Sequence, residues 1–366
     1  STLSSSSAAS DVYKRQSYDH ADVAAQIPID AHMLEALRRD DAGHFDASTE
    51  AWRHWDEDGA VSASCATCHS ADGLPFFAEH GTQIEQEVAQ GMECTTCHTD
   101  VDTGDFAMIE REEVTFPSGA VLSFGNDGDN LCATCHQGRE SAVSVDRRIG
   151  DTGDDVVSDD LGFINVHYFA AAATRFGGEA AGGYQYDGKE YVGLWPHDES
   201  VATCTSCHDP HNQQVDIEST CSECHTDATT VADVRAFREF EGDWDGDGDT
   251  SVGTYYEIAN LEQMLYEAIR SYARDTEGVD PIVYDSHSYP YFFTDANDNG
   301  EVDEDDGRYG TWTPRLLRAA YNYQYAQKDT GDYVHNSQYV IQLLHDSLAD
   351  LGVDVGAMDR PAAGLF

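Results

Sequence analysis

The residues with the clearest capacity for chemistry are the cysteines, because all of them occur in one repeated pattern. The chain has ten cysteines, and each belongs to a Cys-x-x-Cys-His motif. Cysteines three positions apart share one face of a helical turn, so two sulfurs can meet one cofactor while the next residue, a histidine, faces it. The motifs are Cys65, Cys68 and His69; Cys94, Cys97 and His98; Cys132, Cys135 and His136; Cys204, Cys207 and His208; and Cys221, Cys224 and His225.

This spacing is typical of covalent haem c attachment, in which both cysteines become thioethers and the histidine is the proximal iron ligand. Two other chemistries fit the pattern less well. A disulfide within each motif would strain a short ring and leave the adjacent histidines unexplained. Structural zinc sites do not usually place a histidine directly after each cysteine pair. The sequence therefore predicts five haems c, each with its iron, and no disulfide.

The residue on the opposite side of each iron decides between electron transfer and catalysis. A second histidine closes the iron, whereas an open position lets a substrate bind. The chain has sixteen histidines, so several lie outside the motifs. His80 competes for one site, while His287, His335 and His345 belong to a later helical region. The predicted distal ligands all lie in the haem-bearing segment. They are His44, His54, His167, His197 and His211.

Two acidic loops carry oxygen ligands at calcium-binding spacing. Residues 295–306 follow the EF-hand pattern but end in Asp rather than Glu, which resembles dockerin-type calcium loops. The loop that starts at Asp243 keeps the first, third, fifth and sixth positions, and Glu257 is a substitute for the missing twelfth ligand. The alternative is two solvated acidic turns. The predicted calcium ligands are Asp243, Asp245, Asp247, Asp249, Asp295, Asn297, Asn299, Glu301 and Asp306.

The elements around the motifs are expected to be short. Gly, Asp, Thr and Ser are frequent between them, which favours loops and short helices wrapped around cofactors. Alternating aromatic residues around an Asp-Gly turn predict a β-ribbon at 184–192, and a second is expected at 114–124. Apolar residues at helical spacing predict helices over 254–275, 313–327 and 336–351.

The predicted fold is mainly irregular, with short α-helices organised around five haems c and a minor β-ribbon. An α-helical C-terminal region with EF-hand-like calcium loops follows. We expect a pentahaem cytochrome c domain at 17–226 and a helical domain at 227–366. Residues 1–16 are Ser-rich, lack the apolar core of a signal peptide and look like a non-native extension, so the true start and its signal peptide are expected to be missing.

The charge of the chain excludes one class of partner. A formal net charge of −49 repels phosphate backbones, so nucleic-acid binding is excluded as the main role. No run of about 18 apolar residues occurs, and we expect no transmembrane segment. The surface is rich in Asp and poor in Lys, which fits either a high-salt habitat or an ordinary acidic secreted protein whose carboxylates bind metal ions.

Several segments resemble a family of environmental multihaem c-type cytochromes. They are Trp55–Gly59, Ser64–His69, Leu131–Glu140, Asn165–Ala172, Cys207–His211 and Tyr321–Gln324. The resemblance implies an electron carrier outside the cytoplasm with bis-histidine haems, and it favours the five distal histidines named above. It also implies redox partner proteins or extracellular electron acceptors, at an extracellular, cell-surface or periplasmic location.

Three functional alternatives remain at this point. The haem load and the coil-rich middle are similar to extracellular cytochrome filaments, which favours a homopolymeric conductive filament in which a spare histidine such as His20, His32 or His80 ligates a neighbour. A monomeric periplasmic shuttle is the second alternative. The third is a multihaem reductase of nitrite, hydroxylamine or a sulfur oxyanion, although no motif has Lys in place of His.

Overall fold

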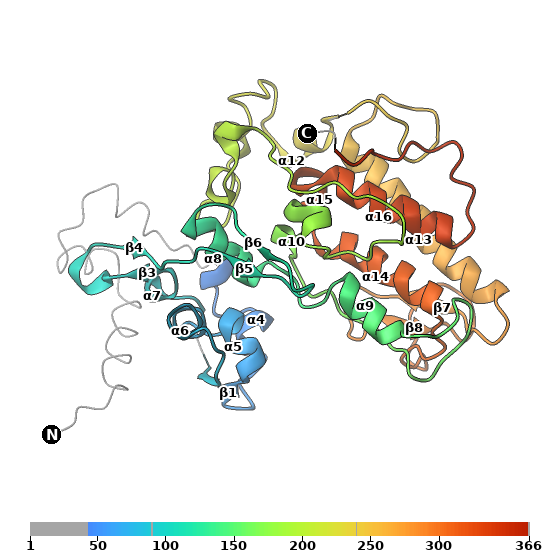
Figure 1. Ribbon diagram of the computed structural model, residues 1–366, viewed down its shortest axis with the longest axis horizontal. Coiled ribbons are helices and arrows are strands. Elements are labelled where there is room, and N and C mark those ends of the chain that lie inside the picture. The colour runs from blue at the N-terminus through green and yellow to red at the C-terminus, as the bar shows by residue number, and fades with distance from the viewer. Residues whose placement is uncertain (1–42, 89–90, 239, 365–366) are drawn as a thin grey trace. The chain divides into compact units, whose positions relative to one another are not determined.

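The computed structural model describes residues 43–88, 91–238 and 240–364, which divide into two compact units (Figure 1). The motif unit contains the described residues up to Glu113, with 123–135 and 200–226. The helical unit contains 114–122, 136–199 and the described residues from Asp227 onward. The expected extension at 1–16, His20 and His32 lie outside the described residues.

The motif unit consists of short helices and two-residue strands. Strands β1 and β2 pair antiparallel, as do β3 and β4. Its buried apolar side chains include Trp52, Val61, Leu74 and Leu131. Its elements are η1 Gly43–Phe45, α4 Glu50–Arg53, β1 Ala60–Val61, α5 Ala63–His69, α6 Gly73–His80, β2 Gln86–Glu87, α7 Cys94–Cys97, β3 His98–Thr99, η2 Val101–Thr103, β4 Ala107–Met108, α8 Asp127–Cys135, η5 Cys204–Ser206 and α11 Ile217–Thr220.

The helical unit contains longer helices and two further antiparallel strand pairs, β5 with β6 and β7 with β8. The first pair confirms the ribbon predicted at 114–124. The elements are β5 Val114–Thr115, β6 Val121–Leu122, α9 Ala142–Ile149, α10 Ala171–Phe176, η3 Gly177–Glu179, α12 Val231–Arg235, α13 Thr254–Asp275, β7 Ile282–Tyr284, β8 Phe292–Thr294, α14 Pro314–Lys328, α15 Asp332–His335 and α16 Ser337–Asp350. Helix η4, Glu199–Val201, contains the point where the sequence passes from the helical unit to the motif unit.

Helices α13, α14 and α16 form the core of the helical unit and lie side by side (Figure 1). Leu265 of α13, Leu316 of α14 and Leu344 of α16 are fully buried. Thr313 caps α14 by accepting the Leu316 amide, and Asn336 caps α16 by accepting the Tyr339 amide. These helices confirm the three that the sequence predicts, because apolar stripes and caps agree with the packing found.

The ribbon predicted at 184–192 is wrong. The turn at Asp187 and Gly188 is present, but no strand forms on either side. Side chains of the core helices take the backbone hydrogen bonds instead: the Tyr184 amide donates to Asn322 Oδ1 at 2.6 Å, and the Val192 amide donates to Gln342 Oε1 at 2.9 Å. Because these bonds satisfy the backbone, the segment lies along α14 and α16 and needs no partner strand.

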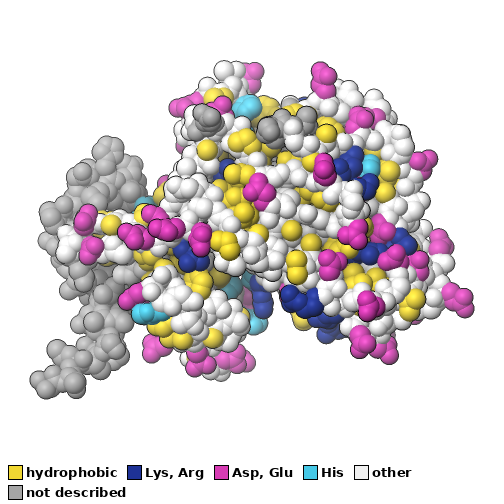
Figure 2. Space-filling view, in the orientation of Figure 1, with side chains coloured by type: hydrophobic (Ala, Val, Ile, Leu, Met, Phe, Trp, Pro, Cys, Tyr) yellow, Lys and Arg dark blue, Asp and Glu magenta, His cyan; other side chains and the backbone are white. Residues whose placement is uncertain are grey.

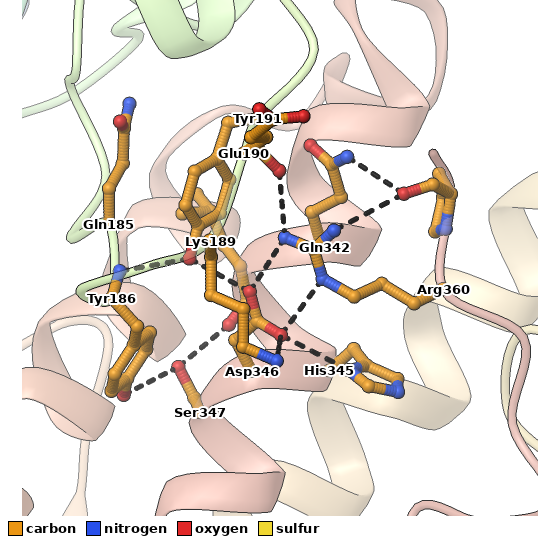
Figure 3. A network of polar contacts seen from close by, with 12 residues as sticks. Gln185, Tyr186, Lys189, Glu190, Tyr191, Gln342, His345, Asp346, Ser347 and Arg360 are labelled. Atoms are coloured by element: carbon orange, nitrogen blue, oxygen red, sulfur yellow. Dashed lines mark hydrogen bonds and ion pairs between the residues drawn. The ribbon is translucent and has the colours of Figure 1, made fainter. Parts of the chain in front are cut away.

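A buried carboxylate fastens this segment to α16 (Figure 3). Asp346 accepts two hydrogen bonds from Arg360, at 2.9 and 2.8 Å, and one from the Tyr191 hydroxyl at 2.8 Å. Burial raises the pKa of Asp346, but hydrogen bonds from His345 and Arg360 outweigh burial and lower this pKa to about 2. The carboxylate is therefore ionised and fully paired within the helical unit.

The predicted fold class is confirmed at a coarse level, since the described chain is largely irregular with mostly short helices and a few small sheets. The units also assign 114–122 and 136–199 to the C-terminal helices, beyond the boundary predicted at 226. In the described part of the chain, no helix combines the length and the apolar character needed to span a bilayer. Figure 2 shows Asp and Glu side chains spread over the visible face.

Candidate haem-binding sites

Each cysteine pair lies on a single turn of the motif unit. The first motif lies within α5, the second pair bounds α7, and the third pair ends α8. In the fourth and fifth motifs, the His208 amide donates to the Cys204 carbonyl at 2.9 Å and the His225 amide to the Cys221 carbonyl at 2.8 Å. Both sulfurs of a motif therefore lie on one side of a turn, as attachment to one cofactor requires.

Three of the motif histidines are oriented by backbone carbonyls. Nδ1 of His69 lies 2.9 Å from the Ala51 carbonyl oxygen, and Nδ1 of His136 lies 2.8 Å from that of Phe169. His208 makes the same contact, at 3.1 Å, with Gln213. A carbonyl oxygen can only accept, so Nδ1 carries the proton in each ring. In the neutral ring this tautomer has its lone pair on Nε2, the atom that a proximal ligand offers to iron.

His98 differs, because its Nδ1 atom is buried and has no hydrogen-bond partner. Its ring lies near that of His211, with the two centroids 6.4 Å apart and the planes 36° from parallel. Burial lowers the pKa of His211, and the neighbouring His98 lowers it further. Neutral imidazole is the metal-binding form, so the lowered pKa of His211 suits ligation. Together with the thiol turns, this donor set fits haem c.

Aromatic rings surround the first motif histidine. The ring of Trp55 lies 4.9 Å from that of His69 and 5.0 Å from that of His54, measured between centroids. The structure thus brings His54, a predicted distal ligand, to the same indole as His69. Glu50 lies 3.2 Å from Nδ1 of His54. His54 is exposed, so its ring is accessible in this arrangement.

The other predicted distal histidines divide between the units. His44 lies in the motif unit, where its amide donates to the Gln213 side chain at 3.0 Å, and Gln213 is the residue that orients His208. His167 and His197 lie in the helical unit, with φ angles of 76° and 52°. Histidine is among the few non-glycine residues enriched in this left-handed region.

The third motif lies next to two others. The Cys135 Sγ atom is 3.9 Å from the Thr67 carbonyl oxygen, and Cys68 Sγ is 4.0 Å from that of Thr134. Nearer the start of α8, the Cys204 amide donates to Asp129 at 2.8 Å. A hydrogen bond between the Cys132 and Cys204 thiols lowers the pKa of Cys132 and raises that of Cys204. The first and fourth motifs therefore both lie next to the third.

Sequence reasoning missed the partners that orient the histidines. Ala51, Phe169 and Gln213 act through their carbonyl oxygens, which every residue type has, so no residue pattern identifies them. Asp129 was also missed, although it stands three residues before Cys132. Its carboxylate is buried in the structure, but in this acidic sequence nothing separates it from the many exposed Asp residues.

The acidic loop at Asp243 gathers carboxylates. Oxygens of Asp243, Asp245 and Asp247 lie within 4.8 Å of one another. Asp249 follows them along the loop, where it accepts the Ser251 amide. Glu257 is not available as a substitute ligand, because Arg238 lies 2.6 Å from one of its oxygens and the amides of Trp244 and Asp245 donate to the other.

The loop at 295–306 is closed by hydrogen bonds and by an arginine. Asp295 Oδ2 lies 3.0 Å from Nη2 of Arg270 and accepts the Gly300 amide at 2.8 Å. The amide groups of Asn297 and Asn299 both donate to Asp303, and Asp306 accepts the Asp303 amide. Glu301 is exposed. The predicted ligands thus share one loop, with a guanidinium bound to its first carboxylate.

Comparison with known proteins gives relatives in one class. The chain is 26% identical to the c-type polyheme cytochrome OmcB of Geobacter sulfurreducens, in an alignment that covers 83% of this chain and 46% of that protein. It is 25% identical to the c-type polyheme cytochrome OmcC of the same species, over 84% of this chain and 45% of that protein. The chain thus spans about half the length of these relatives.

No family model matches the chain, and no solved structure does either. The similarity to the two polyheme cytochromes nevertheless extends over most of the chain, including a region with five Cys-x-x-Cys-His turns. The predicted resemblance of this chain to the multihaem c-type cytochromes is therefore confirmed.

Proposed function

We propose that this chain is an electron-transfer protein that carries one haem c, with its iron, at each of its five motifs. The observation that carries the proposal is the state of the motif histidines. Three of them have Nδ1 held by a backbone carbonyl, so Nε2 is the ring nitrogen that would bind iron, and each stands beside two thiols on one turn. Bound haem supplies a reversible one-electron couple; the chain's own residues fix the ligands and bring the motifs close together.

The second motif offers a specific ligand pair, His98 and His211. Metal–imidazole bonds of about 2.0 Å place the centroids of two rings on opposite sides of one metal about 6 Å apart. The observed separation of 6.4 Å fits this arrangement. We assign His211 as the distal ligand of the haem at Cys94 and Cys97.

The remaining distal ligands in this proposal are His44, His54, His167 and His197. Their support differs. His44 and His54 lie beside residues that contact a motif histidine, Gln213 and Trp55 respectively. His167 lies two residues before Phe169, whose carbonyl orients His136. His197 rests on its sequence position alone.

A variant cycle tests the His98–His211 pair. In the holoprotein, His211→Ala should convert one haem from low-spin to high-spin in the ferric EPR spectrum. In a Cys94→Ala/Cys97→Ala background that lacks the second haem, the same substitution should create no high-spin haem. A high-spin signal that persists there would assign His211 to another iron. His287→Ala, at an exposed histidine of the helical unit, is the matched control.

The contacts of the third motif support an order for electron exchange. It contacts the first motif through Cys135 and the fourth through Cys132 and Asp129. Burial, together with the nearby Cys132, raises the pKa of Cys97 to about 11, which supports the second motif as a further neighbour of the third. We propose that the third haem exchanges electrons with these three neighbours, and that the fifth is reached through the fourth, because Cys221 lies near Cys207.

The proposal includes a location and partners. Haem c is attached outside the cytoplasm, so we place the protein at the cell surface or in the extracellular space, with the periplasm as the alternative. Its partners are then redox proteins or extracellular electron acceptors. The support from the curated relatives is that they are polyheme cytochromes, and the chain spans about half their length.

We also propose assembly into a homopolymer, supported by the density of motifs. Five haems in one small unit form a row of redox sites, with one end for electron entry and the other for exit. The distance over which electrons travel increases when copies of the protein abut through a heterologous interface. The charge of −49 opposes assembly at low ionic strength. Light scattering in high salt with calcium should therefore detect polymers. A strictly monomeric protein under these conditions leaves the periplasmic shuttle as the better account.

A reductase is the competing function. It requires one iron with an open coordination position, which gives a high-spin haem in the unmodified holoprotein. Five low-spin haems would support the electron carrier instead. The same ferric EPR spectrum, recorded before any substitution, therefore separates the two functions.

Calcium at the two acidic loops completes the proposal. The cluster of Asp243, Asp245 and Asp247 supports it for the first loop. In the second loop Arg270 binds Asp295, so a calcium ion there would have to displace a guanidinium. We therefore rank the first loop above the second, and assign calcium a structural role in the helical unit.

A further inference from the structure

Lys328 is a buried cation at the end of α14. It is 4% exposed, and within the described residues no carboxylate forms an ion pair with it. Other cations of the helical unit do have carboxylates: Arg238 pairs with Glu257, Arg270 with Asp295 and Arg360 with Asp346. In a chain with 69 Asp and Glu residues, an unpaired buried lysine is exceptional and costly. Burial lowers the pKa of Lys328, because the charged form is less favourable away from water.

Two tyrosines surround the ammonium group. Its Nζ atom lies 3.6 Å from the centroid of the Tyr168 ring and 4.0 Å from that of Tyr291. The hydroxyl groups of the two tyrosines are hydrogen bonded to each other at 2.6 Å. The rings therefore supply cation–π stabilisation, and the hydrogen bond holds them together as a clasp around the charge.

The clasp holds a strained segment. His167 and Phe169, on either side of Tyr168, have φ angles of 76° and 56°. A non-glycine residue in this region costs free energy and persists only where its surroundings enforce it. Here the Phe169 amide donates to the Lys328 carbonyl at 2.9 Å. Lys328 thus acts on the segment through both its side chain and its main chain.

The strained segment ends on a motif histidine. The Phe169 carbonyl accepts the Nδ1 proton of His136 at 2.8 Å. Two hydrogen bonds and one residue therefore connect Lys328 to His136. A positive charge near a haem disfavours the ferric state, which carries one more positive charge than the ferrous state, and so raises the reduction potential.

We propose that Lys328 is a positioning residue that clasps residues 167–169 against His136 and raises the reduction potential of the third haem. This inference rests on the proposed function, because it requires His136 to ligate a haem. It goes beyond that function by assigning a role in tuning one haem to a residue that lies outside every motif. It also gives a reason for the strain at His167 and Phe169.

The test is a spectroelectrochemical titration of the five-haem protein. Lys328→Met, which keeps the packing volume and removes the charge, should shift the midpoint potential of one haem downward. Lys328→Arg should restore the original potential. The shift should be absent in a Cys132→Ala/Cys135→Ala background that lacks the third haem. Lys189→Met, at a half-exposed lysine of the same unit, is the control and should shift nothing.

Two outcomes would overturn the inference. One is a Lys328→Met holoprotein with five low-spin haems and unchanged potentials. The other is an equal shift in Lys189→Met, which would make the effect one of overall charge. If Lys328→Met does not fold, Lys328→Gln removes the same charge and decides in the same way. Failure of the proposed function is distinct, because it appears first as fewer than five haems in the mass of the unmodified protein.

Discussion

The two units reach a folded state by different routes. Among the described residues, the longest helix of the motif unit is α8, with nine residues, whereas α13 of the helical unit has 22. The helical unit buries a continuous core of Leu, Ile and Tyr side chains from three helices, and the described part of the motif unit buries few large apolar side chains. A small unit with little core usually depends on a bound group for stability. We expect the motif unit to depend on its haems, and the helical unit to be stable without them.

The largest expected effect is a loss of stability of the motif unit when the haem with the most neighbouring motifs is removed. Cys132→Ala/Cys135→Ala should open the motif unit to limited proteolysis, because α8 contacts both α5 and η5. Cys221→Ala/Cys224→Ala should open it less, since that motif lies in turns rather than in a helix that contacts two other elements. Fragments of the helical unit should survive in both variants, as mass spectrometry of the digests can show. Equal cleavage of the two units would break the comparison.

The helical unit should respond instead to its own buried ion pair. Asp346→Asn leaves Arg360 without its carboxylate, and breaking a buried pair costs about 3–5 kcal/mol. Chemical denaturation followed by far-UV circular dichroism should therefore show lower stability of the helical unit, with an unchanged haem spectrum. Asp159→Asn, at an exposed carboxylate of the same unit, is the control. A stability loss confined to the motif unit would contradict our account.

Acid should destabilise the helical unit through the same carboxylate. The pKa of Asp346 is about 2 in the folded unit, below the ordinary value of about 3.9. A lowered pKa contributes stability above the unfolded value, and this contribution is lost as the pH falls through the folded value. The difference amounts to about 2.5 kcal/mol, lost between about pH 4 and pH 2. Asp346→Asn should flatten this part of the stability–pH curve; an identical curve would exclude Asp346 as its source.

Calcium should have the smallest effect. Weak sites with dissociation constants of about 10⁻⁴–10⁻³ M gain about 1–3 kcal/mol at about 10 mM calcium. Calcium should raise the melting temperature of the helical unit, and Asp247→Asn should reduce this rise more than Asn299→Ala does. A rise that survives both substitutions would place the bound calcium outside the two loops.

Much of the helical unit could be predicted because its signals are local. The apolar stripes of 254–275 and 336–351, with Asn336 as a cap, specify helices that packing then confirms. The prediction for 184–192 failed because the hydrogen-bond partners of this segment, Asn322 and Gln342, are far away in the sequence. The predicted ribbon required strand pairing, and the fold supplied side-chain acceptors instead.

The candidate site divides in the same way. The thiols and their adjacent histidines could be predicted, because two cysteines and a histidine on one turn are a local pattern. The contact of His98 with His211 could not, since more than 100 residues separate them and only the fold brings them to 6.4 Å. The role of Phe169 could not be predicted either, because it acts through its backbone carbonyl, which every residue type has.

The most direct test of the central claim is the mass of the mature chain and of its peptides. Our account predicts five covalent haem additions, each on a peptide that contains one Cys-x-x-Cys-His turn, and no free thiol. Fewer than five additions, or unmodified cysteines at any of the five turns in fully matured protein, would contradict it.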